Sequence, residues 1–205
     1  MFDQTFKAQL AKITTDTRLI EKLWKEIEVQ YSKSGRFYHT LSHLDNLIVS
    51  LTPVLDNILD WQTIVLSIAY HDIVYNPLKK DNEEKSAELA NKRLVELGAS
   101  KFQREKCFSQ IMATKTHSFS NDSDTNYFTD ADLSILGSDD DDYVRYAQLI
   151  RKEYKYFPDF IYKPGRLKVL HHFLEMPRIY KTDYFYQRFE QQARTNLKNE
   201  LKELS

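Results

Sequence analysis

The dipeptide His71-Asp72 closes an apolar run and is the pair of residues best placed to do chemistry. Residues 63–70 before it are almost uninterruptedly apolar, which predicts a buried segment. A carboxylate at the end of such a segment needs a partner, because desolvating an unpaired charge costs several kcal/mol. A cation bound by both side chains meets that need. The alternative is a structural pair in which the aspartate orients a buried histidine.

Two histidines precede this dipeptide on another predicted helix. His43 shares a helix face with Leu47, and His39 stands four residues earlier, where it could share that face. Taken alone, a histidine at the edge of a core is more often structural than a ligand. The two histidines have the spacing of zinc proteases, but Thr40 stands where those enzymes carry the catalytic glutamate, which argues against that class.

Two aspartates, Asp130 and Asp132, lie in the otherwise apolar stretch 128–136. Asp130 is the natural N-cap of a helix that starts here, and Asp132 then lies in the first turn and faces the core. Helical bundles build metal sites from side chains that project inward from facing helices. The predicted metal ligands are therefore His43, His71, Asp72 and Asp132.

The order His, His-Asp, Asp on separate helices resembles the HD superfamily of metal-dependent phosphohydrolases. Residues 69–73 and 131–134 are similar to the segments that carry these motifs in that superfamily. The resemblance to a bacterial group of predicted HD-type hydrolases spans residues 20–200 and lies in the segments 38–43, 82–87, 111–117, 130–137 and 150–154. It implies an all-α HD fold, a divalent metal and phosphoester chemistry, but it does not supply a substrate.

A site of two imidazoles and two carboxylates suits Mn, Fe, Co, Ni or Zn better than Ca, and Mg is less favoured. We expect one divalent ion rather than two. Such an ion lowers the pKa of a bound water and polarises a phosphoryl oxygen. Asp72 is expected both to bind the ion and to take the proton of the nucleophile. Glu83 and Glu84 are candidates for a separate base.

Phosphate chemistry also needs positive charge, because arginine and lysine neutralise and orient phosphate groups. Lys115 is favoured for its closeness to His117, which we expect to act beside the metal or on the phosphate rather than on a second ion. Each basic residue also fits a surface cation on a solvated helix. The adjacent pair at 171–172 is interpreted as structural. The candidate phosphate ligands are Arg36, Lys115, Arg145, Arg151 and Arg166, with Lys115 and Arg151 preferred.

The composition excludes several classes of protein. The 205 residues carry a formal net charge of -1, which argues against a dedicated nucleic-acid binder. Cys107 is the single cysteine, so an internal disulfide is excluded and a reducing compartment is favoured. The N-terminus is too polar for a signal peptide, and there is no apolar run long enough to span a membrane. We expect a cytoplasmic protein whose partner is a small phosphorylated molecule.

Four glycines and five prolines are few, which favours long helices. We expect one all-α domain over residues 1–205, a single HD-type bundle of eight to ten helices. Its core would span about 20–180, with a C-terminal helix at 184–204. The acidic run 139–142 is interpreted as a helix start rather than a calcium loop. The other helices are expected at 15–31, 40–51, 62–74, 82–97, 100–114, from 130 or 132 to 137, at 143–156, and from a bend at 164–165 to 175.

Three functions fit these residues. The leading one is a metal-dependent phosphohydrolase that acts on a small phosphate ester, with a nucleotide as one candidate. The alternative is a non-catalytic, metal-stabilised protein that binds a nucleotide or regulates a partner through the same cavity. The third is a helical scaffold whose histidines and aspartates are hydrogen-bonded to one another.

Overall fold

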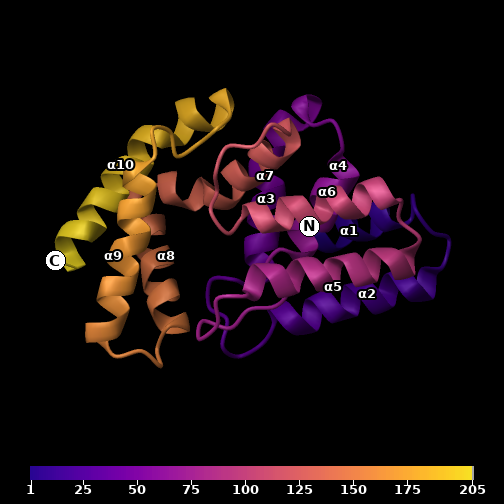
Figure 1. Ribbon diagram of the computed structural model, residues 1–205, viewed down its shortest axis with the longest axis horizontal. Coiled ribbons are helices and arrows are strands. Elements are labelled where there is room, and N and C mark those ends of the chain that lie inside the picture. Colours follow the sequence, from indigo (N-terminus) through magenta and orange to yellow (C-terminus); the bar gives the residue numbers. More distant parts are fainter. Residues whose placement is uncertain (205) are drawn as a thin grey trace. The chain divides into compact units, whose positions relative to one another are not determined.

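The computed structural model describes residues 1–204, and the regular elements in that range are all helical (Figure 1). These described residues form ten α-helices and two short 3₁₀-helices, so the predicted all-α class and the predicted number of helices are confirmed. The contacts divide the chain into two compact units, Met1–Thr129 and the residues from Asp130 onward. The division falls inside one continuous helix, α7 (Ser123–Asp132). The expected single HD-type domain stays a prediction.

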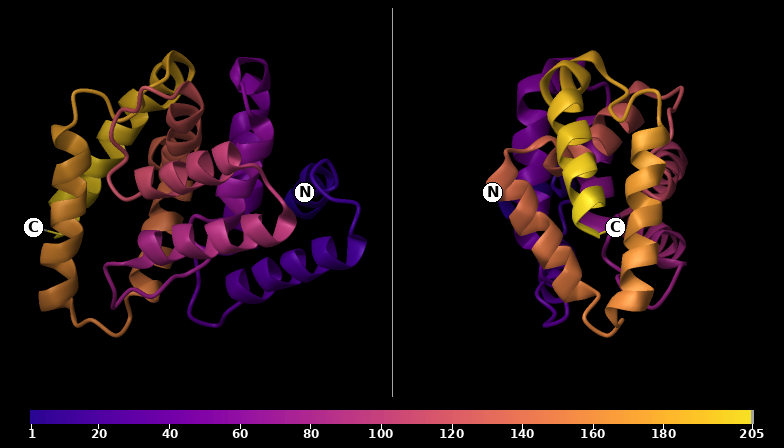
Figure 2. Two further views of the ribbon diagram at one scale, coloured as in Figure 1. Left: turned by 45° about the vertical axis from the view of Figure 1, so that its right-hand side comes forward. Right: turned by 90° about the vertical axis from the view of Figure 1, so that its left-hand side faces the viewer.

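The first unit is built around α4 (Trp61–Tyr70). Residues 63–70 are all buried, which confirms the central position predicted for this apolar run. Contacts join α4 to α1, α3, α5 and α6, and α5 also packs along α6 (Figures 1 and 2). The remaining elements of this unit are α1 (Phe2–Leu10), α2 (Thr17–Tyr31), α3 (Leu41–Leu51), η1 (Thr52–Asn57), α5 (Asn82–Leu97), α6 (Lys101–Ala113) and the first part of α7.

Helix ends that are set by capping residues lie where the sequence predicts them. Asp16 caps α2 by accepting hydrogen bonds from the backbone N–H groups of Arg18 and Leu19, both at 3.0 Å. Ser100 and Gln103 form a capping box at the start of α6. Gly98 ends α5 with a φ of 83°, a left-handed conformation that glycine adopts without strain.

Several predicted boundaries are wrong, and α8 (Asp140–Glu153) ends three residues before the predicted position 156. Helix α4 ends at Tyr70 instead of residue 74. Helix α7 begins at Ser123, inside the stretch expected to be a loop, because Asp122 accepts hydrogen bonds from the backbone and hydroxyl of Thr125 at 3.1 and 2.6 Å. The bend expected at 164–165 lies within α9 (Asp159–Glu175). Pro164 has no N–H group to donate to the carbonyl of Phe160, four residues earlier. The helix tolerates this loss because Phe160 lies in the first turn and is 77 % exposed. The short helix α1 was not predicted.

The second unit packs three long helices and one 3₁₀ turn. Its elements are η2 (Leu133–Gly137), α8 (Asp140–Glu153), α9 (Asp159–Glu175) and α10 (Asp183–Leu204). Asp139 caps α8 by accepting a hydrogen bond from the N–H of Asp142, so the acidic run is the helix start that was predicted. A buried bidentate ion pair joins Arg166 of α9 to Glu200 of α10 at 2.7 and 2.8 Å.

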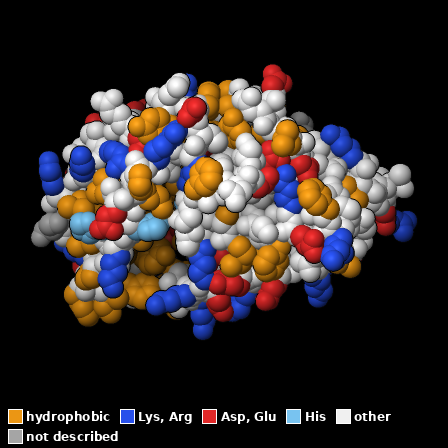
Figure 3. All heavy atoms as spheres, turned by 45° about the horizontal axis from the view of Figure 1, so that its top comes forward, with side chains coloured by type: hydrophobic (Ala, Val, Ile, Leu, Met, Phe, Trp, Pro, Cys, Tyr) orange, Lys and Arg blue, Asp and Glu red, His pale blue; other side chains and the backbone are white. Residues whose placement is uncertain are grey.

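The surface carries both signs of charge. On the face drawn in Figure 3, basic and acidic side chains are interspersed with hydrophobic ones, as the balanced composition leads one to expect. None of the helices within residues 1–204 has the combined length and apolarity that crossing a membrane requires.

Candidate metal centre

His43 and His71 bring two imidazoles together inside the first unit. His43 lies in the first turn of α3, and His71 is the C-cap of α4. Both side chains are buried, with exposed fractions of 4 % and 1 %. Their Nε2 atoms lie 3.2 Å apart. The two predicted ligands therefore face each other from separate helices.

A backbone contact fixes the tautomer of His71. Its Nδ1 atom lies 2.9 Å from the carbonyl oxygen of Ile68, which can only accept a hydrogen bond. Nδ1 therefore carries the proton and donates, and in the neutral ring Nε2 presents its lone pair toward His43. This is the arrangement found in metal-binding histidines, where a carbonyl or carboxylate holds the second nitrogen and orients the ring.

Asp72 lies beside His71, but it is not among the three residues whose ligand atoms all lie within 4.8 Å of one another. Its Oδ2 atom lies 3.2 Å from Nε2 of His71 and 3.6 Å from Nε2 of His39. With metal–ligand bonds of about 2.1 Å, two donor atoms 3.2 Å apart subtend roughly 100° at a shared ion. The 3.2 Å separation between the Nε2 atoms of His43 and His71 therefore fits neighbouring ligands of one transition-metal ion.

Asp132 reaches the cluster along α7. The ring of Phe128 contacts the ring of His71, with the centroids 5.8 Å apart. Asp132 stands four residues after Phe128 on the same continuous helix, so both side chains lie on one helix face. One ligand atom each from His43, His71 and Asp132 lie within 4.8 Å of one another, and this group could hold a metal ion.

Asp130 has a different role from Asp132. It is fully buried near the end of α7, so its prediction as the N-cap of a helix is wrong. Its carboxylate accepts hydrogen bonds from the backbone N–H groups of Lys181 and Thr182 and from the Thr182 hydroxyl. Burial raises the pKa of Asp130, and the charge of Lys181 and these hydrogen bonds oppose that shift. Asp130 thus ties α7 to the segment before α10.

The turn that follows Asp132 is held from α10 and the segment before it. The hydroxyl of Tyr180 donates to the carbonyl of Leu133 at 2.9 Å. The amide of Asn196 donates to the carbonyls of Leu136 and Ser138, both at 2.9 Å. Because η2 is fixed at both ends, the backbone at Asp132 is fixed as well.

His71 and Asp72 lie beyond the helix because distant side chains pair their backbone groups. The hydroxyl of Tyr31 lies 3.2 Å from the N–H of Asp72 and accepts from it. The guanidinium of Arg36 donates to the carbonyls of Asp72 and Ile73 at 2.7 and 2.8 Å. These bonds replace those that another helical turn would make, so the dipeptide sits in a turn.

Arg36 is occupied by this turn. Besides the carbonyls of Asp72 and Ile73 it donates to the carbonyl of His39 at 3.2 Å. Its guanidinium also stacks on the rings of Tyr31 and Tyr75, 4.6 and 5.3 Å from the ring centres. Arg36 therefore positions the backbone of a predicted ligand, a role that sequence reasoning missed and that no local pattern signals. Its contact with phosphate stays a prediction.

Lys115 and His117 follow α6. Lys115 pairs with Glu84 and donates to the carbonyl of Lys80 at 3.3 Å, and the hydrogen bond to Glu84 raises the lysine pKa. His117 has a positive φ of 51° and is half-buried. It is not part of the group whose ligand atoms lie within 4.8 Å. Burial raises the pKa of Glu83, and the charge of Asp72 adds to the effect. The catalytic roles of Lys115 and His117 remain predictions.

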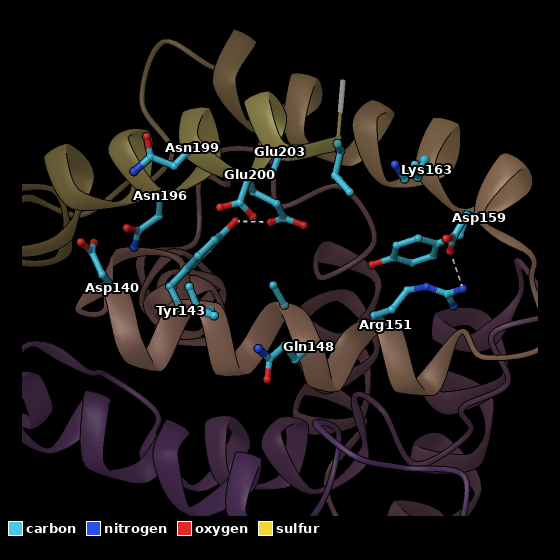
Figure 4. A pocket seen from close by; sticks show the side chains of 14 residues that line it. Asp140, Tyr143, Gln148, Arg151, Asp159, Lys163, Asn196, Asn199, Glu200 and Glu203 are labelled. Atoms are coloured by element: carbon cyan, nitrogen blue, oxygen red, sulfur yellow. Dashed lines mark hydrogen bonds and ion pairs between the residues drawn. The ribbon is translucent and has the colours of Figure 1, made fainter.

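Arg151 lies in the second unit, in a cavity of about 520 Å³ lined by α8, α9 and α10 (Figure 4). It donates to Asp159 at 2.8 Å and to the carbonyls of Tyr154 and Phe157, both at 3.0 Å. Arg166 is engaged by Glu200, as described above. The predicted metal ligands are not among the residues that line this cavity, and phosphate binding by Arg151 stays a prediction.

The histidines of α9 lie outside the cluster. His171 and His172 are both exposed and belong to the second unit, and neither is part of the group that could hold an ion. Cys107 is buried, and burial raises the pKa of its thiol to about 12.

No protein family, curated protein or solved structure matches this chain.

Proposed function

We propose that this protein is a metal-dependent phosphohydrolase that acts on a small phosphate ester. The observation that carries the proposal is the convergence of His43, His71 and Asp132, with Asp72 beside His71. The mixture of imidazole nitrogen and carboxylate oxygen suits Mn, Fe, Co, Ni or Zn. The resemblance of the ordered motif to the HD superfamily supports phosphoester chemistry and a cytoplasmic enzyme.

Each residue of the centre has an assigned task in this proposal. His43, His71 and Asp132 would hold the ion, and the Ile68 carbonyl keeps the proton of His71 on Nδ1, so that Nε2 would be its metal-binding atom. A divalent ion bound there would supply an acidic water and polarise a phosphoryl oxygen. Asp72, beside His71, would join the ligand set and accept the proton of the attacking water.

The test combines elemental analysis with turnover. Purified protein is analysed for transition metals and then assayed with p-nitrophenyl phosphate and bis(p-nitrophenyl) phosphate in the presence of Mn, Co, Ni, Fe or Mg. We expect near-stoichiometric metal and release of nitrophenol. His71→Ala and Asp132→Ala should lose metal and turnover together. His171→Ala, which removes an exposed histidine outside the cluster, should keep both.

Two outcomes would overturn the assignment. Full metal content and full turnover in His71→Ala would show that the centre is elsewhere. Stoichiometric metal with no product, even over hours at high protein concentration, would favour the non-catalytic nucleotide-binding alternative. In that case nucleotides should raise the melting temperature in proportion to their concentration over Kd.

A further inference from the structure

Several large apolar side chains are exposed where the chain turns from α8 into α9. Tyr156, Phe160 and Ile161 have exposed fractions of 72 %, 77 % and 48 %, and Pro158 between them is exposed as well. This turn closes one end of the α8–α9 pair (Figures 1 and 2). Apolar side chains that gather on a surface mark an interaction site, whereas single ones need no explanation. We call residues 154–161 the aromatic turn, and all of them belong to the second unit.

Arg151 ties the aromatic turn together from inside. Its guanidinium donates to the carbonyls of Tyr154 and Phe157, both at 3.0 Å, and to the carboxylate of Asp159 at 2.8 Å. The same guanidinium lies over the ring of Tyr162, 4.6 Å from the ring centre. Because these contacts fix the backbone of the turn, the exposure of its outer side chains is a property of the folded state.

Basic side chains surround the exposed apolar ones. Residues 151–163 contain four basic and two acidic side chains, although the whole chain has a formal net charge of -1. Neither acid offsets the excess at the surface, because Glu153 is buried and Asp159 is paired with Arg151 at 2.8 Å. The other three basic residues are Lys152, Lys155 and Lys163. The aromatic turn therefore combines apolar side chains with a local positive charge.

We propose that the aromatic turn binds the surface of a membrane that contains anionic lipids. Aromatic side chains are favoured at the level of the lipid headgroups, where one end of the ring is in an apolar medium and the other in water. Lysine lays its stem along apolar surface and extends its charge toward a negatively charged leaflet. Lys155 has this arrangement, with its Nζ atom 5.3 Å from the centre of the Tyr156 ring. The inference uses the second unit alone and is independent of the metal centre.

The size of the aromatic turn favours a lipid surface over a protein partner. A stable protein interface takes about 20–30 residues from each side, far more than residues 154–161 supply. Binding to a bilayer surface needs only a few apolar side chains that enter it, together with attraction to anionic lipids. The exposed side chains also stand outside the cavity between α8, α9 and α10, because Tyr156, Phe160 and Ile161 are not among its lining residues.

Co-sedimentation of the full chain with vesicles tests the proposal. One set of vesicles is phosphatidylcholine alone, and the other is an equal mixture of phosphatidylcholine and phosphatidylserine. We expect the wild type to bind the mixed vesicles, and added salt to weaken this binding because it screens the charges. Phe160→Ser should lower the partition coefficient about ten- to hundredfold, since a buried aromatic side chain is lost. Phe102→Ser is the matched control, because Phe102 is 68 % exposed on α6 of the first unit, and it should bind as the wild type does.

A second pair of variants tests the charge. Lys155→Gln combined with Lys163→Gln should weaken binding to the mixed vesicles about tenfold or more, because each lysine near an anionic surface adds to the attraction. Lys12→Gln combined with Lys92→Gln removes two exposed lysines of the first unit and should leave binding unchanged. Equal binding of the wild type to both kinds of vesicle would contradict the selection of anionic lipids.

A fluorescent variant reports insertion directly and does not depend on the loss of a side chain. Phe160→Trp keeps an aromatic ring, and its emission should shift to shorter wavelength when mixed vesicles are added. The wild type should show no shift, because Trp24 and Trp61 lie in the first unit. Absence of the shift in Phe160→Trp, or equal binding by the wild type and Phe160→Ser, would overturn the proposal. A dimer that dissociates in Phe160→Ser, without vesicle binding by the wild type, would assign the turn to a second copy of the chain instead.

Discussion

The Nε2 atom of His71 lies 3.2 Å from Nε2 of His43 and 3.2 Å from the Asp72 carboxylate, while its Nδ1 atom is held by the Ile68 carbonyl. A lone pair that faces a second imidazole and a carboxylate is unfavourable unless a cation or a proton lies between them. The geometry therefore leaves two physical solutions, a bound metal ion or a hydrogen bond shared between imidazoles. They differ in their response to chelation.

Metal removal should destabilise the protein if an ion occupies this centre. Binding at a concentration one hundred times Kd stabilises the native state by about 2.7 kcal/mol. We expect EDTA to lower the melting temperature, and Mn or Zn to restore it in a concentration-dependent way. His43→Ala should abolish the response to metal, whereas His172→Ala, at an exposed position, should keep it. A melting temperature indifferent to EDTA would indicate the shared hydrogen bond.

Arg36→Lys should weaken the candidate metal centre, because Arg36 holds the backbone on which the ligands stand. Lysine keeps the positive charge but cannot bond the carbonyls of His39, Asp72 and Ile73 with one planar group. We expect a loss of roughly 2–4 kcal/mol in the free energy of unfolding, because buried hydrogen bonds to a charged group are removed.

Metal affinity should fall in the same Arg36→Lys variant, measured by competition with a chromogenic chelator. Arg18→Lys at an exposed position is the control, because it replaces arginine by lysine away from the centre and should change neither stability nor metal affinity. Unchanged stability with weaker phosphate binding would instead favour the direct phosphate contact predicted from the sequence.

These contacts show which parts of the structure could be predicted. Helix α5 was predicted with its true bounds because its start and its C-terminal Gly98 are signalled within the segment itself. The end of α4 was misplaced because its cause is non-local: Tyr31 and Arg36, far back in the chain, take the backbone groups of the residues after Tyr70.

The residues of the candidate metal centre could be predicted by residue type, since imidazole and carboxylate at apolar edges need partners. The contacts that hold these side chains in place could not be predicted. The N-cap was assigned to Asp130, whereas Asp122 caps α7 and Asp130 binds the backbone before α10. Nor does any sequence pattern signal that Lys181 folds back toward Asp130, because the two residues are far apart in the chain.

Gly137→Ala should disturb both the fold of the second unit and the centre. A Cβ atom at position 137 would lie 2.6 Å from the Cβ and the carbonyl oxygen of Phe189, so backbone must move. Overpacking of this kind costs about 1–3 kcal/mol or more.

Gly137 ends the turn that starts beside Asp132, so the metal affinity of the alanine variant should fall together with the free energy of unfolding in urea. Gly165→Ala is the control, because nothing lies within 4 Å of its added Cβ. That helix interior substitution should stabilise α9 by about 0.5–1 kcal/mol. An unaltered metal affinity in Gly137→Ala would show that η2 does not position Asp132.

Lys181 should make stability depend on pH in a defined direction. Burial lowers its pKa below the ordinary 10.5 in the folded state, although Asp130 opposes the shift. Between the two pKa values the unfolded chain binds more protons than the folded chain, so the contribution of Lys181 to the free energy of unfolding rises with pH. Below the folded pKa the cost of burying the ammonium is fully present, and above 10.5 it vanishes.

Lys181→Met has no charge to bury, so it should be more stable than the wild type at pH 7. The difference should shrink as the pH rises toward 10.5, where the unfolded lysine also loses its proton. Urea unfolding with EDTA and without phosphate, at several pH values from 7 to 10.5, measures this difference. Lys198→Met, at an exposed position, controls for the removal of one positive charge. A difference that stays constant or grows over this range would mean that the attraction of Asp130 outweighs the cost of burying the Lys181 ammonium.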